Sequence, residues 1–199
     1  MTFWDDQNGI AMGDPTDTCL SVIITRDGGR TWRKVSCDLL PAAAAGEAAF
    51  AASNSNIAVH GQHAWIVSGG ARARVLHTPD RGKSWEVFDT PIKEGGQMTG
   101  IYTVDFLDEQ HGIIFGGDWN DKSNSFNNKA ITTDGGRSWQ LLADGQEPGY
   151  RSCVRYAPGT NGQMIVAAGI PGISYSLDSG QSWQNLSEQS FYTMRFGDS

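Results

Sequence analysis

Short apolar runs, each followed by a polar turn sequence, recur along the whole chain. Leu20–Ile24, Ile101–Phe106 and Met164–Gly169 are typical of these runs, and none continues with the spacing of an amphipathic helix. Ala42–Ala52 is rich in alanine, but it stands directly before another strand-like run, where the repeat described below calls for a strand. The pattern therefore predicts an all-β chain of short strands.

One eight-residue phrase, [Ser/Thr]-x-Asp-x-Gly-x-[Ser/Thr]-Trp, occurs four times between such runs. The copies span residues 25–32, 78–85, 132–139 and 176–183. A fixed phrase that returns about every fifty residues is typical of propeller blades. We therefore expect a repeat protein.

Every residue type in the phrase suits a tight hairpin. Aspartate can accept backbone N–H groups, glycine tolerates positive φ, and the hydroxyls can satisfy further turn groups. The tryptophan that follows buries a large apolar ring. We interpret the phrase as a structural device rather than a ligand site, formed by Asp27, Gly29, Trp32, Asp80, Gly82, Trp85, Asp134, Gly136, Trp139, Asp178, Gly180 and Trp183.

The runs around each phrase predict four antiparallel strands per unit, which is one propeller blade. First strands are expected at Ala48–Ala52, Ile101–Phe106 and Ser152–Tyr156. Residues 190–197 resemble the first strand of a fifth blade. Because a propeller that stops within a blade leaves an open strand edge, we expect a part of a longer propeller, or a partner or oligomer that completes it. The four predicted blades cover residues 1–37, 46–90, 98–143 and 149–187 of one domain, 1–199.

The charge balance excludes some classes of partner. The 199 residues carry a net charge of −7 and show no basic patch with interleaved aromatic residues. Nucleic acid and anionic membrane surfaces are therefore not expected partners. The sequence shows no apolar span long enough to cross a membrane and no signal peptide.

Three cysteines lack the spacing of a zinc site. Cys19 and Cys37 are equally far from Gly28 at the first predicted hairpin tip, so they are expected to face each other across strands. In an oxidising compartment they would form a bridge, and in the cytosol they would be two small buried residues. Both alternatives stay open.

The phrase is the Asp-box, or BNR repeat, of sialidases and of many non-catalytic propellers. Motifs between the boxes resemble bacterial relatives of the photosystem II stability and assembly factor. This resemblance implies six or seven blades, an exported or periplasmic, membrane-proximal setting, and a scaffold that binds a protein or peptide. The motifs that carry it are Met12–Pro15, Gly46–Asn54, Ala73–Val75, Gly116–Asp118 and Gly149–Ser152.

A sialidase-like or other Asp-box glycoside hydrolase is the alternative. A sialidase needs three arginines, a tyrosine with a glutamate partner, and an acid aspartate, but the Phe/Tyr-Arg-Ile-Pro start that supplies its first arginine is absent. A xyloglucan-cleaving enzyme needs a cleft between two propellers. We therefore expect no catalytic residue, and the histidines and glycines give no reason to expect a metal or a cofactor. The residues available to a sialidase would be Arg74, Arg151, Arg155, Tyr102, Tyr150, Glu47 and Asp14.

The predicted binding place is one mouth of the central channel. Alignment of the first strands puts Glu47, Ile101, Arg151 and Phe191 at the same position, and first strands line the channel of a propeller. Loops and strand ends at such a mouth usually carry binding. Glu47 and Arg151 would act there as a protein or peptide docking surface, as a small-ligand site, or only as paired residues that stiffen the rim. The expected binding residues are Glu47, Arg74, Asp118, Tyr150 and Arg151.

Overall fold

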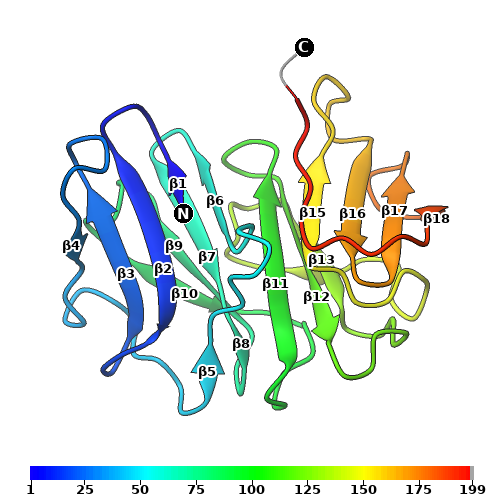
Figure 1. The fold of residues 1–199 in the computed structure, drawn as a ribbon, viewed down its shortest axis with the longest axis horizontal. Coiled ribbons are helices and arrows are strands. Elements are labelled where there is room, and N and C mark those ends of the chain that lie inside the picture. Colours follow the sequence, from blue (N-terminus) through cyan, green and yellow to red (C-terminus); the bar gives the residue numbers. More distant parts are fainter. Residues whose placement is uncertain (198–199) are drawn as a thin grey trace.

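The computed structural model of the protein describes residues 1–197, and within them it is all-β, with eighteen strands and no helix. The described chain accordingly holds no helix that could cross a membrane. The strands form four antiparallel sheets, one after another in chain order from blue to orange (Figure 1). This arrangement is that of consecutive propeller blades, as the repeat predicts.

Each blade contains four strands joined by short turns. Blade 1 has β1 (Thr2–Phe3), β2 (Gly9–Pro15), β3 (Leu20–Thr25) and β4 (Arg33–Lys34). Blade 2 has β6 (Ile57–His60), β7 (His63–Val67), β9 (Arg74–Thr78) and β10 (Glu86–Asp89). Blade 3 has β11 (Thr99–Phe106), β12 (Gly112–Asp118), β13 (Lys129–Thr132) and β14 (Gln140–Leu141). Blade 4 has β15 (Cys153–Tyr156), β16 (Ile165–Gly169), β17 (Gly172–Ser176) and β18 (Gln184–Ser187).

The first strand of blade 2 differs from the expectation of a strand at Ala48–Ala52. Only Glu47–Ala48 is a strand (β5), and it pairs with β8 (Gly69–Gly70), which adjoins β11 in the sheet of blade 3. The chain then leaves the sheet, and β6 pairs with β7 instead. After the exit, the side chain of Phe50 lies over Gly69 and stacks on Tyr102.

Residues 190–197, for which the sequence predicts the first strand of a fifth blade, are extended chain without strand pairing. The segment runs across β15 (Figure 1) and is held by single bonds: Phe191 N donates to Gly169 O at 3.1 Å and Ser152 Oγ to Tyr192 O at 2.9 Å. Such isolated bonds position the chain without forming a ladder.

The core lies between successive blades. Separate clusters of buried apolar side chains join blades 1 and 2, blades 2 and 3, and blades 3 and 4. Trp65 of β7 is fully buried, stacks on Phe106 of blade 3 and donates its Nε1–H to Gly135 O at 2.7 Å. Trp4 similarly donates to His63 O at 2.8 Å, from blade 1 to blade 2. Each blade is therefore stabilised by its neighbour.

The four Asp-boxes share one set of hydrogen bonds. Asp27 accepts from Thr25 Oγ1 at 2.8 Å, from Thr31 N at 2.8 Å and from Thr31 Oγ1 at 2.6 Å, while Gly29 N donates to Thr25 Oγ1 at 2.9 Å. Gly29 has φ 88°, a conformation that favours glycine. These contacts account for the residue types of the phrase. The same pattern surrounds Asp80, Asp134 and Asp178.

The box tryptophans are half-buried rather than fully enclosed. Three of them donate the indole N–H to the carbonyl of the box glycine, over 3.3 Å in Trp85, 3.0 Å in Trp139 and 2.9 Å in Trp183. Trp32 instead meets Phe3 edge-on at 6.0 Å. The ring and its hydrogen bond together close each hairpin.

Stability is expected to fall in acid through these boxes. The hydroxyl of Thr31 on Asp27, and that of Ser182 on Asp178, hold the pKa of each carboxyl near about 2, below the ordinary 3.8. A depressed folded pKa adds stability above the ordinary pKa, and that stability is lost as the pH falls toward the folded value. The melting temperature should therefore drop between about pH 4 and about pH 2. The Asp178→Asn variant should show a smaller acid-induced drop than the parent, and parallel curves for the two proteins would contradict the assignment.

Candidate functional site

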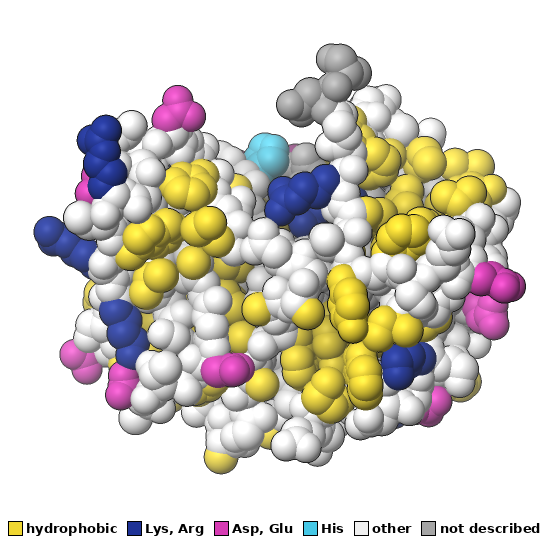
Figure 2. Space-filling view, in the orientation of Figure 1, with side chains coloured by type: hydrophobic (Ala, Val, Ile, Leu, Met, Phe, Trp, Pro, Cys, Tyr) yellow, Lys and Arg dark blue, Asp and Glu magenta, His cyan; other side chains and the backbone are white. Residues whose placement is uncertain are grey.

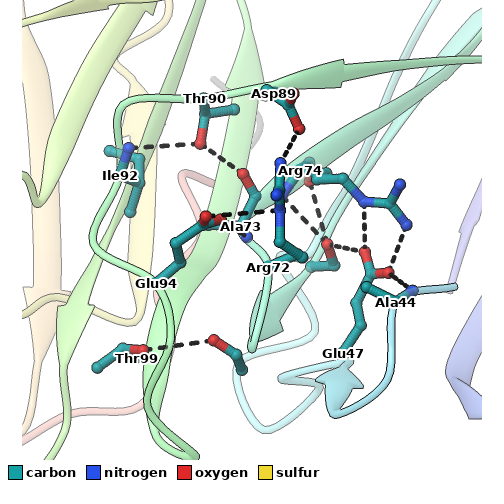
Figure 3. A network of polar contacts seen from close by, with 12 residues as sticks. Ala44, Glu47, Arg72, Ala73, Arg74, Asp89, Thr90, Ile92, Glu94 and Thr99 are labelled. Carbon is teal, nitrogen blue, oxygen red and sulfur yellow. Dashed lines mark hydrogen bonds and ion pairs between the residues drawn. The ribbon is translucent and has the colours of Figure 1, made fainter.

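Glu47 of β5 and Arg74 at the start of β9 form a buried ion pair (Figure 3). The Glu47 side chain has no exposed surface, and its carboxylate accepts from Arg74 Nε at 3.0 Å, from Arg74 Nη2, and from Ser68 Oγ at 2.6 Å. It also accepts the backbone N–H of Ala44 at 2.8 Å. With these partners the carboxylate fixes the β5–β8 pairing and offers no free charge to the channel.

A second, more exposed ion-pair group lies beside it (Figure 3). Arg72 Nη2 contacts Asp89 Oδ1 at 2.6 Å and Arg72 Nε contacts Glu94 Oε1 at 3.4 Å. Glu94 also accepts the N–H of Ala73 at 2.7 Å. These contacts tie the loop between β8 and β9 to the last residue of β10 and to the chain that follows it. Because Arg72 and Asp89 are exposed, the pairs add little stability and mainly hold the loop.

Asp118 ends β12 and is also paired. Its carboxylate lies 3.2 Å from Lys93 Nζ and accepts the N–H of Asn120 at 2.9 Å. Partial burial raises the pKa of Asp118. The contacts with Asn120 and Lys93 lower it by more than burial raises it, so the pKa lies below its ordinary value. The residue is therefore an ionised turn cap at the edge of blade 3.

Tyr150 and Arg151 are consecutive and point to opposite sides of the chain that enters blade 4. Both are buried, at 2% and 5% exposure, and they line different cavities. Extended backbone sends successive side chains to opposite faces, which explains the separation.

The cavity on the Tyr150 side is aromatic. We call Phe50, Tyr102, Trp119 and Tyr150 the aromatic cluster. Phe50 stacks on Tyr102 with ring centroids 4.1 Å apart, and Tyr102 meets Tyr150 edge-on at 4.7 Å. Together with Tyr192 and others these residues line a cavity of about 200 Å³. Burial raises the pKa of the Tyr102 and Tyr150 hydroxyls, so both rings are uncharged. Figure 2 shows hydrophobic side chains gathered in the middle of this face, beside the lower half of β11.

The cavity on the Arg151 side is larger and mixed in character, at about 610 Å³. We call it the inter-blade pocket, because it lies between the β12–β13 loop of blade 3 and strands β17 and β18 of blade 4. Arg151 Nη1 donates to Tyr150 O and Nη2 to Ser174 Oγ, each at 2.8 Å. Burial lowers the pKa of the guanidinium to about 10, so it stays protonated at neutral pH.

The predicted binding residues thus do not converge on one site. Glu47 meets Arg74, Asp118 meets Lys93, and Tyr150 and Arg151 face away from each other. Phe50 and Trp119 are the cluster members that the sequence interpretation did not single out. Their signal is weak, since each is one aromatic residue in a chain with 10% aromatic content.

The residues available to a sialidase are likewise dispersed. Arg74 is paired with Glu47, and Arg155 bonds Val104 O at 3.1 Å and Asp105 at 3.5 Å, whereas Arg151 bonds the neutral Ser174 Oγ in the inter-blade pocket. Three arginines with separate partners cannot share one substrate carboxylate without rearrangement. Residues 1–197 contain no group of three acidic, histidine or cysteine side chains placed to hold a metal.

Four successive antiparallel sheets, each with an Asp-box hairpin, define an Asp-box β-propeller protein. The chain belongs to the family described as photosynthesis system II assembly factor YCF48, whose model matches residues 1–107. No curated protein matches the chain.

Solved structures share the fold. "YCF48 bound to D1 peptide" has a TM-score of 0.63 and 21% identity, over 95% of this chain and 52% of that one. YCF48 from Cyanidioschyzon merolae has a TM-score of 0.58 and 16% identity, over 96% and 55%. The GH74 xyloglucanase from Xanthomonas campestris has a TM-score of 0.62 and 17% identity, over 92% and 29%. The chain therefore spans about half the length of the YCF48 structures.

Proposed function

We propose that the chain is a non-catalytic, assembly-factor-like scaffold that holds a peptide or protein segment against the aromatic cluster. The observation that carries this proposal is the cavity of about 200 Å³ framed by Phe50, Tyr102, Trp119 and Tyr150. Rigid aromatic rings supply large contact area at low entropic cost and are enriched where proteins bind one another. The family and the peptide bound to a YCF48 relative support the same class of partner.

The site is built to bind rather than to react. Phe50 stacks on Tyr102, Tyr150 meets Tyr102 edge-on, and Tyr102 donates its hydroxyl to Met98 O at 2.8 Å. Two acidic groups close in sequence to the cluster are already paired, since Glu47 bonds Arg74 and Asp118 bonds Lys93. A nucleophile or general acid needs a free reacting atom at the ligand, and these groups lack one.

Removal of cluster rings should weaken peptide binding. Peptides selected by phage display on the parent chain should carry aromatic or long apolar residues. Their affinity should fall about tenfold or more in Trp119→Ala and in Phe50→Ala, as for hot-spot residues. Phe126→Ala is the matched control, because Phe126 is 61% exposed and lies outside the cluster. Equal affinity for parent, both cluster variants and control would exclude the aromatic cluster as the binding place.

A glycoside hydrolase of the GH74 or sialidase type is the competing function, because GH74 propellers share the fold. Arg74, Arg151 and Arg155 have different partners, and this arrangement does not favour a sialidase. We expect no turnover of xyloglucan, other β-glucans or a sialoside by the protein. Turnover that is abolished in Arg151→Ala or Glu47→Ala would establish the enzyme instead.

We also infer an exported or periplasmic, membrane-proximal location. Cys19 and Cys37 are joined in a disulfide with their Cα atoms 5.5 Å apart. Disulfides persist mainly in oxidising compartments, which supports this inference. Thiol labelling of the protein in intact cells, with and without prior reduction, tests it, and two freely labelled cysteines without reduction would refute it.

A further inference from the structure

The inter-blade pocket is formed entirely by blades that the chain itself contains. Lys122, Glu147 and Arg151 contribute charged groups, and Ser174, Trp183 and Asn185 line the blade 4 side. A cavity of about 610 Å³ is within the size range of ligand sites. Its walls do not depend on any further blade.

The guanidinium of Arg151 is a buried cation that has no carboxylate partner in the described part of the chain. The residue is 5% exposed, and its side chain donates to two neutral oxygens, Tyr150 O and Ser174 Oγ. Nε has no hydrogen-bond partner in this described part. Among residues 1–197 no ion pair joins Arg151 to an acidic side chain, in contrast to Arg74 and Arg155. Burial of an unpaired charge is costly, so a residue in this state points to a missing anion.

The other charged groups of the pocket have a different arrangement. Lys122 is only half-buried, and its ammonium donates to Trp119 O at 2.6 Å and lies 3.9 Å from the centre of the Trp119 ring. Glu147 and Glu188 are exposed at the rim, and the charge of Glu147 acts on Arg151. The pocket therefore presents one cation inside and carboxylates outside.

Trp183 adds an apolar wall. Its indole N–H is used by Gly180 O at 2.9 Å, so only the ring surface is available to a ligand. Gln184 and Asn185 beside it are exposed. Gln184 Oε1 already accepts from the Tyr175 hydroxyl at 2.6 Å, so the amide of Asn185 and the NH2 group of Gln184 are the groups that suit a peptide backbone. A ring with amide groups beside it matches an extended peptide better than a bare inorganic anion.

We propose that the inter-blade pocket binds a carboxylate of a peptide at Arg151, with a neighbouring cationic group of that peptide at Glu147 and Glu188. The carboxylate would accept from the second N–H groups of Nη1 and Nη2, beyond those given to Tyr150 O and Ser174 Oγ, in a bidentate arginine contact. The inference rests on the proposed peptide-binding function and names a second contact for the same partner. The same partner would then contact Tyr150 in the aromatic cluster and Arg151 in the inter-blade pocket, on opposite sides of the chain that enters blade 4.

Three synthetic tetrapeptides with the same acetylated, lysine-containing core test the proposal. The first carries glutamate and an amidated C-terminus, the second glutamine and a free C-terminus, and the third glutamine and an amidated C-terminus. Each is titrated into ¹⁵N-labelled chain while the Arg151 Nε–Hε resonance is followed. We expect saturable shifts with the first or the second peptide and none with the third, and the responsive one identifies the source of the carboxylate.

Substitutions separate this contact from the aromatic cluster. Arg151→Gln should weaken the responsive peptide about tenfold or more, whereas Arg155→Gln, which changes an arginine outside the pocket, should not. Glu147→Gln keeps the exposed rim folded and should weaken the lysine-containing peptide but not a lysine-free version. If Arg151→Gln fails to fold, the affinities of Glu147→Gln for the lysine-containing and the lysine-free peptide decide.

An equal response of the chain to all three peptides, or no response up to millimolar concentration, overturns the proposal. Phe50→Ala tests the aromatic cluster alone, because Phe50 does not line the inter-blade pocket, so loss of one contact is distinguishable from loss of the other.

Discussion

Replacement of Trp65 by alanine is expected to lower the free energy of unfolding by about 3–5 kcal/mol. The ring is fully buried and stacks on Phe106 with centroids 3.5 Å apart. Its N–H satisfies Gly135 O in the Asp-box turn of the next blade, and Gly136 of the same turn packs against the ring. The variant would lose the apolar contact and leave a buried carbonyl without its donor. Urea denaturation followed by far-ultraviolet circular dichroism measures the change.

Two variants separate the contributions at this position. Trp65→Phe keeps an aromatic ring but loses the N–H, so we expect a smaller loss of about 1–3 kcal/mol. Trp119→Ala removes a half-buried ring and should cost much less than Trp65→Ala. If Trp65→Ala unfolded at the same urea concentration as the parent, the contact between blades 2 and 3 would not support the fold.

Loss of the Cys19–Cys37 disulfide is the second large effect. The two cysteines are 18 residues apart in sequence, and the bridge ties the start of β3 to the chain after β4. A cross-link of this loop length contributes about 3 kcal/mol by restricting the unfolded chain. The Cys19→Ser, Cys37→Ser double variant should therefore melt several degrees below the oxidised parent. Differential scanning calorimetry with and without reductant measures the difference.

Reductant provides the internal control for that experiment. It should lower the melting temperature of the parent toward that of the double variant and leave the double variant unchanged. Cys153 is buried and unpaired, so it is not expected to respond in either protein. A parent that melts identically in both conditions would show that the bridge adds no stability.

The sequence alone determined the propeller class, because the Asp-box is local chemistry. The bonds of Asp27 span at most four residues, and those of Asp178 repeat them. Such contacts form whenever the residues are present in a hairpin, so four copies of the phrase were enough to predict four hairpins. The expected strand Ile101–Phe106 lies within β11, and the expected strand Ser152–Tyr156 begins one residue before β15. Both were predicted from the local run of apolar residues.

Only the tertiary structure decided where the binding surfaces lie. Alignment of the repeats treated Glu47 and Arg151 as equivalent, yet Glu47 finds Arg74 across 27 residues and Arg151 finds no carboxylate among the described residues. The stack of Phe50 on Tyr102 depends on the chain leaving the sheet after β5, which a strand expected through Ala52 does not contain. The expected contribution of Trp65 to stability depends on its hydrogen bond to Gly135 O, in a turn 70 residues away in the sequence. Contacts of this kind depend on how one blade packs on the next, and a repeat pattern, which describes each blade separately, carries no information about that packing.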